Sequence, residues 1–171
     1  MSKKQIKKTY EFLGEGIARK VYALDQDMVL KVSKGEDGYY QNAVENYIFT
    51  KASPLTKSIL SPILYYSPEH LIMKRAIPLT QFRKDPHVDI SEFKGLEWVN
   101  KSLNELINTF HLYKNDLYHT DSWGVAGNKI LLIDYGCTSK FGDFYYEMLF
   151  RMKNINVYPQ KKRGSKQLQN D

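Results

Sequence analysis

Short apolar runs separated by turn residues fill the start of the chain, and this pattern restricts its fold most. Between residues 9 and 32, apolar runs lie on both sides of Gly14-Glu15-Gly16 and of the turn signal Asp25-Gln26-Asp27. Runs of this length joined by turn residues are typical of neighbouring strands, so we predict a three-stranded antiparallel meander. Two further runs, 63–66 and 71–73, flank Ser67-Pro68-Glu69-His70 and predict another hairpin.

Helical spacing of apolar residues replaces the strand-like runs elsewhere. Residues 40–52 show it after a predicted loop. The clearest amphipathic helix has Ser91 as its predicted N-cap, ends near Asn115, and carries apolar residues at three- and four-residue steps: Leu96, Val99, Leu103, Leu106, Ile107 and Phe110. A hairpin over 123–133 and a last helix over 144–152 follow. This order of strands and helices predicts an α+β fold.

The composition fits a folded domain without disulfides. The chain has 171 residues, of which 42% are apolar, and a single cysteine, Cys137. That cysteine excludes an internal disulfide and a four-cysteine zinc site. No apolar run approaches the roughly 20 residues needed to cross a bilayer, and residues 1–8 lack the apolar stretch of a secretory signal. We therefore expect a cytoplasmic protein without a membrane partner.

The net charge of +6 raises nucleic-acid binding as one alternative. Much of the excess positive charge lies near the two ends of the chain, in Lys3, Lys4, Lys7, Lys8, Lys161, Lys162, Arg163 and Lys166. Basic ends bind nucleic acid or acidic partners in some proteins, but a solvated face explains most charge runs. The aromatic and basic stripe of single-strand binders is missing from the sequence. Nucleic acid is therefore the weakest alternative, and residues 156–171 are expected to form a basic, disordered tail.

Two elements near the start of the chain carry residues suited to binding phosphate. Gly14 and Gly16 lack side chains, so backbone N–H groups could approach a phosphate, although an ordinary turn has the same pattern. Lys31 lies inside an apolar strand and needs an anionic partner if it is buried. Glu45, on the helix predicted next, could supply that partner. Alternatively, Lys31 points to solvent beside an unrelated glutamate.

Three aspartates follow in the second part of the chain. Asp116 is expected to end the long helix, Asp121 lies in the loop after it, and Asp134 closes the apolar run 130–133. Carboxylates close to one another repel unless a cation lies between them, and carboxylate oxygens are ligands of Mg²⁺. Each aspartate alone is equally well explained as a helix-end or turn residue.

In this order, the motifs resemble those of the eukaryotic-like protein kinase superfamily, and more narrowly of its small bacterial and phage members. Residues 14–21 look like the Gly-rich loop G-x-G-x-x-G-x-V, with Arg19 in place of the third glycine. Val29-Leu30-Lys31 resembles V-A-I-K, and Glu45 matches the helix glutamate that pairs with its lysine. Residues 116–121 are similar to the catalytic loop D-x-x-x-x-N with Asp121 replacing Asn, and 134–136 resemble D-F-G. The resemblance covers roughly residues 10–136.

The resemblance implies ATP and Mg²⁺ as cofactors and a role for each charged residue. Lys31 would hold the α- and β-phosphates with Glu45 orienting it, and Asp116 would accept the proton of the attacking hydroxyl. Asp121 and Asp134 would bind metal ions. The nucleotide-binding residues implied by the resemblance are Gly14, Gly16, Arg19, Val21, Lys31, Met73, Arg75 and Ala76, the last three from the strand and hinge that hold adenine.

The resemblance also implies a protein kinase-like two-lobe architecture. Residues 1–76 would form an N-lobe with an antiparallel sheet, a helix of the αC type and the hinge. Residues 77–155 would form a reduced, truncated helical C-lobe with the catalytic loop. Because no A-P-E motif follows Gly136, we expect the platform that binds peptide to be missing, or to come from a partner chain or a second copy.

The sequence therefore predicts a minimal ATP- and Mg²⁺-dependent kinase that phosphorylates a hydroxyl. The substrate class stays open between a Ser/Thr residue of a protein and a small molecule, because Tyr118 replaces a lysine common in Ser/Thr kinases and Lys114-Asn115 stands where His-Arg is usual. The alternative is a non-catalytic kinase-like module that binds nucleotide or a protein.

Overall fold

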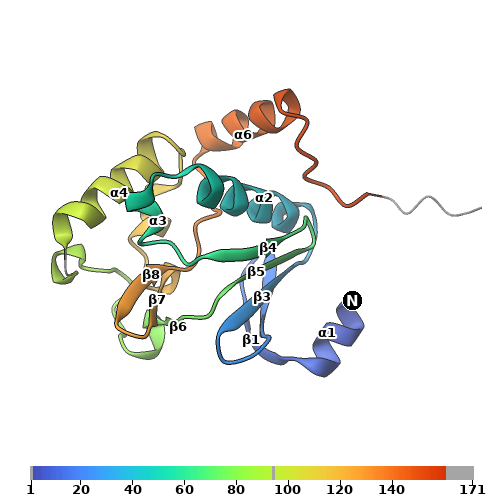
Figure 1. Ribbon diagram of the computed structural model, residues 1–171, viewed down its shortest axis with the longest axis horizontal. Helices are drawn as coiled ribbons and strands as arrows, with labels where there is room; N and C mark the ends of the chain where they lie inside the picture. Colours follow the sequence, from blue (N-terminus) through green and yellow to red (C-terminus); the bar gives the residue numbers. More distant parts are fainter. Residues whose placement is uncertain (1, 94, 161–171) are drawn as a thin grey trace, which may run out of the picture.

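The computed structural model describes residues 2–93 and 95–160 of the chain. These residues form an α+β fold in which an antiparallel five-stranded sheet is followed by a region richer in helices (Figure 1). The predicted meander and hairpin are confirmed, and they join into one sheet of order β1-β2-β3-β5-β4. Its strands are β1 (Glu11–Glu15), β2 (Arg19–Ala23), β3 (Met28–Ser33), β4 (Ile63–Tyr66) and β5 (His70–Lys74).

Helix α2 (Glu36–Lys51) connects β3 to the rest of the sheet and lies against β3 and β4. Its existence is confirmed, but it begins earlier than predicted, with Glu36 and Asp37 in its first turn. Acidic residues there interact favourably with the helix dipole. Gly38 lets this turn approach the sheet, since a Cβ at that position would lie 2.6 Å from the Ala18 carbonyl oxygen. The short helix α3 (Pro54–Lys57) follows.

A second, smaller sheet begins directly after β5. Ile77 pairs with Val125, and the predicted hairpin around Gly127 is confirmed. The sheet has the order β6-β7-β8, with strands β6 (Ile77–Pro78), β7 (Trp123–Ala126) and β8 (Lys129–Leu132). The link between β5 and β6 therefore passes from one sheet to the other within a few residues.

The helices of the second part differ in their limits from the prediction. Ser91 is no N-cap of a long helix: it lies in the 3-10 turn Ile90–Glu92, where its N–H donates to the Asp89 side chain. The long helix, α4 (Leu96–Asn108), ends before Asn115 because His111 adopts a φ of 54°. Two further helices follow, α5 (Lys114–Leu117) and α6 (Lys140–Met152), and the N-terminal helix α1 (Lys3–Thr9) escaped prediction.

The N-caps explain two of these differences. Ser139 accepts a hydrogen bond from the Gly142 N–H, so α6 begins at Lys140 rather than at 144. Ser2 and Gln5 form a capping box that starts α1. Both are short local signals without apolar periodicity, so the spacing of apolar residues does not predict them.

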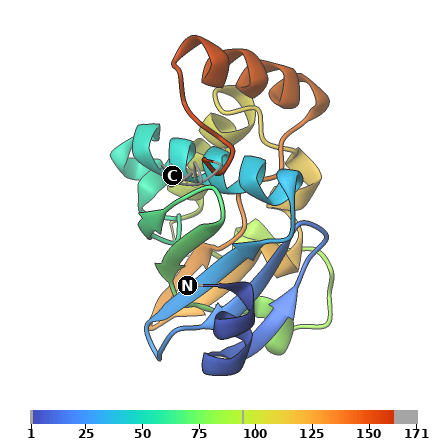
Figure 2. The same cartoon turned by 90° about the vertical axis from the view of Figure 1, so that its right-hand side faces the viewer.

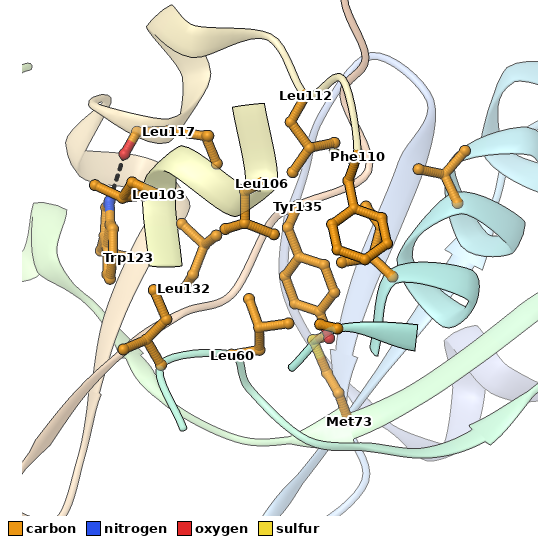
Figure 3. Packing of buried hydrophobic residues seen from close by; sticks show 14 of the residues in the cluster. Leu60, Met73, Leu103, Leu106, Phe110, Leu112, Leu117, Trp123, Leu132 and Tyr135 are labelled. Carbon is orange, nitrogen blue, oxygen red and sulfur yellow. Dashed lines mark hydrogen bonds between the residues drawn. The ribbon is translucent and has the colours of Figure 1, made fainter. Parts of the chain in front are cut away.

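One hydrophobic core connects the five-stranded sheet with α2, α4 and the second sheet (Figure 3). Met73 of β5, Leu106 of α4 and Leu132 of β8 all belong to it. Buried Tyr135 lies among these residues and donates a hydrogen bond to the Ser61 carbonyl oxygen. The predicted boundary between residues 76 and 77 thus lies between β5 and β6, and residues on both sides of this boundary belong to one core.

Helix α6 and the five-stranded sheet lie on opposite sides of α2 (Figures 1 and 2). After α6 the chain returns toward α2, and Val157 packs into the core at 8% exposure. The beginning of the predicted disordered tail is therefore packed, and its residues 161–171 lie outside the described residues.

Candidate functional site

A pocket of about 520 Å³ lies where the β1–β2 turn, the middle of the five-stranded sheet and the link between the two sheets meet. Eight of the predicted site residues line it: Gly14, Val21, Lys31, Met73, Arg75, Ala76, Asp121 and Asp134. Four others, Gly16, Arg19, Glu45 and Asp116, do not line it. The pocket therefore brings together residues that lie far apart in the sequence, from Leu13 to Asp134.

Lys31 and Glu45 form the predicted pair. The Lys31 Nζ atom lies 2.9 Å from Glu45 Oε1, and both side chains are buried. The same Nζ donates to the Ile133 carbonyl oxygen at 2.7 Å. The alternative of a solvent-facing Lys31 is therefore wrong, and the lysine joins the sheet, α2 and the end of the run 130–133.

Arg19 lies in β2. Its side chain does not line the pocket, although the resemblance to a Gly-rich loop implied a nucleotide-binding role for it. Its side chain is 5% exposed and forms two hydrogen bonds to the Glu45 carboxylate, at 2.9 and 3.0 Å. Arg19 and Val21 stand on one face of β2, and Val21 pairs with Lys31. Strand alternation would have predicted this side: Arg19 shares the face of Lys31.

Asp134 contacts both buried cations, Arg19 and Lys31. Its Oδ1 atom lies 2.6 Å from Arg19 Nη2 and 3.7 Å from Lys31 Nζ, while 54% of the side chain is exposed. Burial of the carboxyl acts to raise its pKa, but the charges of Lys31 and Arg19 outweigh burial and hold the pKa below its usual range. Asp134 is therefore an ionised carboxylate that also faces the pocket.

The segment after Asp134 is tied to α2. The Tyr135 N–H donates to Glu45 Oε1 at 3.1 Å. A Cβ at Gly136 would lie 2.9 Å from the Gln41 carbonyl oxygen, so the chain approaches α2 too closely for a side chain. Glu45 thus holds Lys31, Arg19 and this segment at once.

Asp121 lies on the same pocket with a different partner. It is exposed, and its Oδ1 atom lies 2.7 Å from His119 Nδ1. Asp121 and Asp134 offer carboxylate oxygens to one pocket, but the predicted group of three aspartates is absent. Within residues 2–93 and 95–160, no group of three or more His, Cys, Asp or Glu side chains is placed to hold a metal ion.

Asp116 lies in α5 and not at the end of the long helix. It is half-buried and lies beside the Cys137 thiol. Burial and the neighbouring Asp116 raise the pKa of Cys137 to about 12, so the thiol keeps its proton beside this carboxylate. This partnership had no signal in the sequence, because the two residues come from separate elements.

The glycines of the β1–β2 turn differ from each other. Gly14 lies at an irregularity in the pairing of β1 with β2 and lines the pocket. The Gly16 N–H donates to the Arg19 carbonyl oxygen at 3.0 Å, which closes the turn. Lys34 Nζ also donates to the Gly16 carbonyl oxygen at 2.7 Å and pairs with Glu15 at 2.6 Å. Gly16 therefore shapes the turn, and Gly14 borders the pocket.

Comparison of the chain with known proteins gives no family. No family model matches it, and no curated protein matches it. Among the described residues, no helix is both long and apolar enough to cross a membrane.

Proposed function

We propose that this chain is a small kinase-like phosphotransferase that uses ATP and Mg²⁺ to phosphorylate a hydroxyl group. The observation that carries the proposal is the buried pair of Lys31 and Glu45 at the wall of a pocket that Asp134 also borders. A buried lysine fixed by a glutamate presents one positive charge to the pocket at a defined place, as binding of a nucleotide's phosphates requires.

The arrangement of the elements supports a kinase-like N-lobe. Glu45 lies on the helix between β3 and β4, and Lys31 lies on β3 of an antiparallel sheet. The pocket is bordered on one side by the glycine turn at Gly14 and on another by residues 73–78. Residues 73–78 would hold the adenine, with Val21 and Val29 as apolar contacts above it.

The donor set of the pocket fits Mg²⁺. This ion is usually bound by one or two carboxylates together with phosphate oxygens and water. Asp134 is ionised, and both it and Asp121 border the pocket. Bound there, the ion would neutralise charge on the phosphates.

The protein's own groups supply the remaining chemistry. Lys31 stabilises negative charge on the phosphates, and Glu45 keeps the lysine in place. Asp116 accepts the proton of the attacking hydroxyl. Because Asp116 stands outside the pocket lining, the hydroxyl would enter from the side of α5.

Transfer of labelled phosphate tests this proposal. Purified protein would be incubated with Mg²⁺ and ATP labelled on its γ-phosphate, alone and with a cell lysate. We expect the wild type to label itself or an acceptor, and Asp116→Asn to lose at least about 100-fold in rate because general base catalysis contributes that much. Equal labelling by wild type and Asp116→Asn would contradict it.

One observation favours a second candidate, a nucleotide-binding module without catalysis. Asp116 does not line the pocket. For this candidate, ATP would bind with Mg²⁺ while no phosphate transfer is detected. Such a result would keep the nucleotide site and remove the phosphotransferase.

A further inference from the structure

A second buried cation, Arg19, lies behind the pocket wall and contacts Asp134, and the proposed phosphotransferase does not use it. Arg19 and Lys31 both contact the Glu45 carboxylate, and both lie within 4 Å of Asp134 Oδ1. Two positive and two negative groups thus form one compact cluster. Their formal charges cancel, which makes burial of the ions tolerable.

Both terminal nitrogens of the Arg19 guanidinium group take part in this cluster. Nη1 donates to Glu45 Oε2 at 2.9 Å and to Asn42 Oδ1 at 3.2 Å. Nη2 donates to Glu45 Oε1 at 3.0 Å and to Asp134 Oδ1 at 2.6 Å. A planar fork of this kind holds two carboxylates in fixed positions, which a lysine ammonium cannot reproduce.

We propose that Arg19 is a resident cation of the nucleotide site: it holds Asp134 and Glu45 in place and supplies part of the positive charge that a metal ion would otherwise supply. The inference rests on the proposed function, since it takes ATP as the ligand. Arg19 acts through Asp134 and through its charge, and is therefore a positioning residue. Its burial at 5% exposure keeps water from screening that charge.

Loss of Arg19 should affect the binding of metal-free ATP and of its magnesium complex to different extents. Without Arg19, the cluster would carry a net negative charge beside the phosphates. Metal-free ATP is more negative than its magnesium complex, so the loss would weaken metal-free binding more than binding with Mg²⁺. The freed Asp134 would also attract Mg²⁺ more strongly, which changes the ratio of the two affinities in the same direction.

Calorimetric titration with ATP, in EDTA and in excess Mg²⁺, measures this ratio. We expect Arg19→Gln to raise the ratio of the metal-free Kd to the Kd with Mg²⁺ by roughly tenfold over wild type, from one unit charge at this depth. Arg19→Lys keeps the charge but loses the fork, so its ratio should stay within about threefold of wild type while its thermal midpoint falls. Circular dichroism checks that each variant is folded.

Arg151→Gln is the matched control, because it removes an arginine whose ion pair with Glu147 lies on the surface of α6. Its ratio should equal that of wild type. Equal weakening of both Kd values in Arg19→Gln would show a merely structural role and overturn the inference, as would an Arg19→Lys ratio equal to that of Arg19→Gln. If Arg19→Gln does not fold, the Arg19→Lys ratio alone decides, and a tenfold rise there would contradict the proposal.

The titrations with ATP distinguish failure of this inference from failure of the proposed function. A protein that binds ATP with Mg²⁺ but shows an unchanged ratio in Arg19→Gln keeps the nucleotide site and loses the resident cation. A wild type that binds ATP in neither buffer loses both.

Discussion

At the scale of single residues, Glu45 carries the most interactions in the site. It is 0% exposed and accepts hydrogen bonds from Lys31, Arg19 and the Tyr135 N–H. The sequence predicted its pairing with Lys31, because a lysine inside an apolar strand requires an anion. It did not predict the contact of Arg19 with Glu45, since the resemblance assigned Arg19 to a glycine loop, whereas Arg19 lies in β2.

Replacing Glu45 should therefore lower the free energy of unfolding. In Glu45→Gln, two buried cations lose one of their two carboxylate partners, and we expect the free energy of unfolding to fall by about 3–5 kcal/mol. Urea unfolding measures this. Glu97→Gln, which breaks an exposed pair with Lys101, should cost less than about 1 kcal/mol; an equal cost in the two variants would contradict the arrangement.

The lowered pKa of Asp134 predicts a pH dependence of stability. Its charged form contributes stability that is present above the carboxyl's usual value of 3.8 and is lost as the pH falls through the lowered pKa. Because the side chain is 54% exposed, the contribution should be no more than about 1 kcal/mol. Urea unfolding of wild type and Asp134→Asn should differ at pH 7, and the difference should shrink progressively as the pH falls below 3.8, whereas a difference that grows with acid would refute it.

At the scale of elements, strands were easier to predict than the limits of helices. Turn residues such as Asp25 and Gly127 mark the strands locally, and those strands are confirmed. The end of α4 depends on tertiary contacts, because His111 packs against Phe141 and Tyr145 of α6. Such contacts form only in the fold, so periodicity within α4 could not reveal them.

The close approach of residues 134–136 to α2 gives a prediction at this scale. A methyl group in Gly136→Ala would meet the Gln41 carbonyl oxygen and the Glu45 side chain, and we expect a loss of about 1–3 kcal/mol in unfolding free energy. Gly16→Ala is the control for stability, since nothing lies within 4 Å of its added Cβ. Thermal unfolding that ranks the two variants in the opposite order would contradict the packing.

At the scale of the whole molecule, one core links both sheets, so the two predicted parts should unfold together. Leu106→Ala removes a fully buried side chain of α4 and should cost about 2–5 kcal/mol. Far-ultraviolet circular dichroism and tryptophan fluorescence should report the same midpoint, because Trp123 belongs to this core. Two separate midpoints would contradict joint unfolding of the two parts. Leu64→Ala, at an exposed site of β4, is the control for the cost of Leu106→Ala.

Binding of ATP at the pocket of Lys31 and Asp134 is the central claim, and calorimetric titration with ATP and Mg²⁺ tests it most directly. Wild type should bind one nucleotide per chain. Lys31→Ala should weaken binding by at least about tenfold, because it removes the positive charge at the pocket wall, while Lys101→Ala on the exposed face of α4 leaves the Kd unchanged. Absence of ATP binding to folded wild type, or equal affinity in wild type and Lys31→Ala, would contradict the claim.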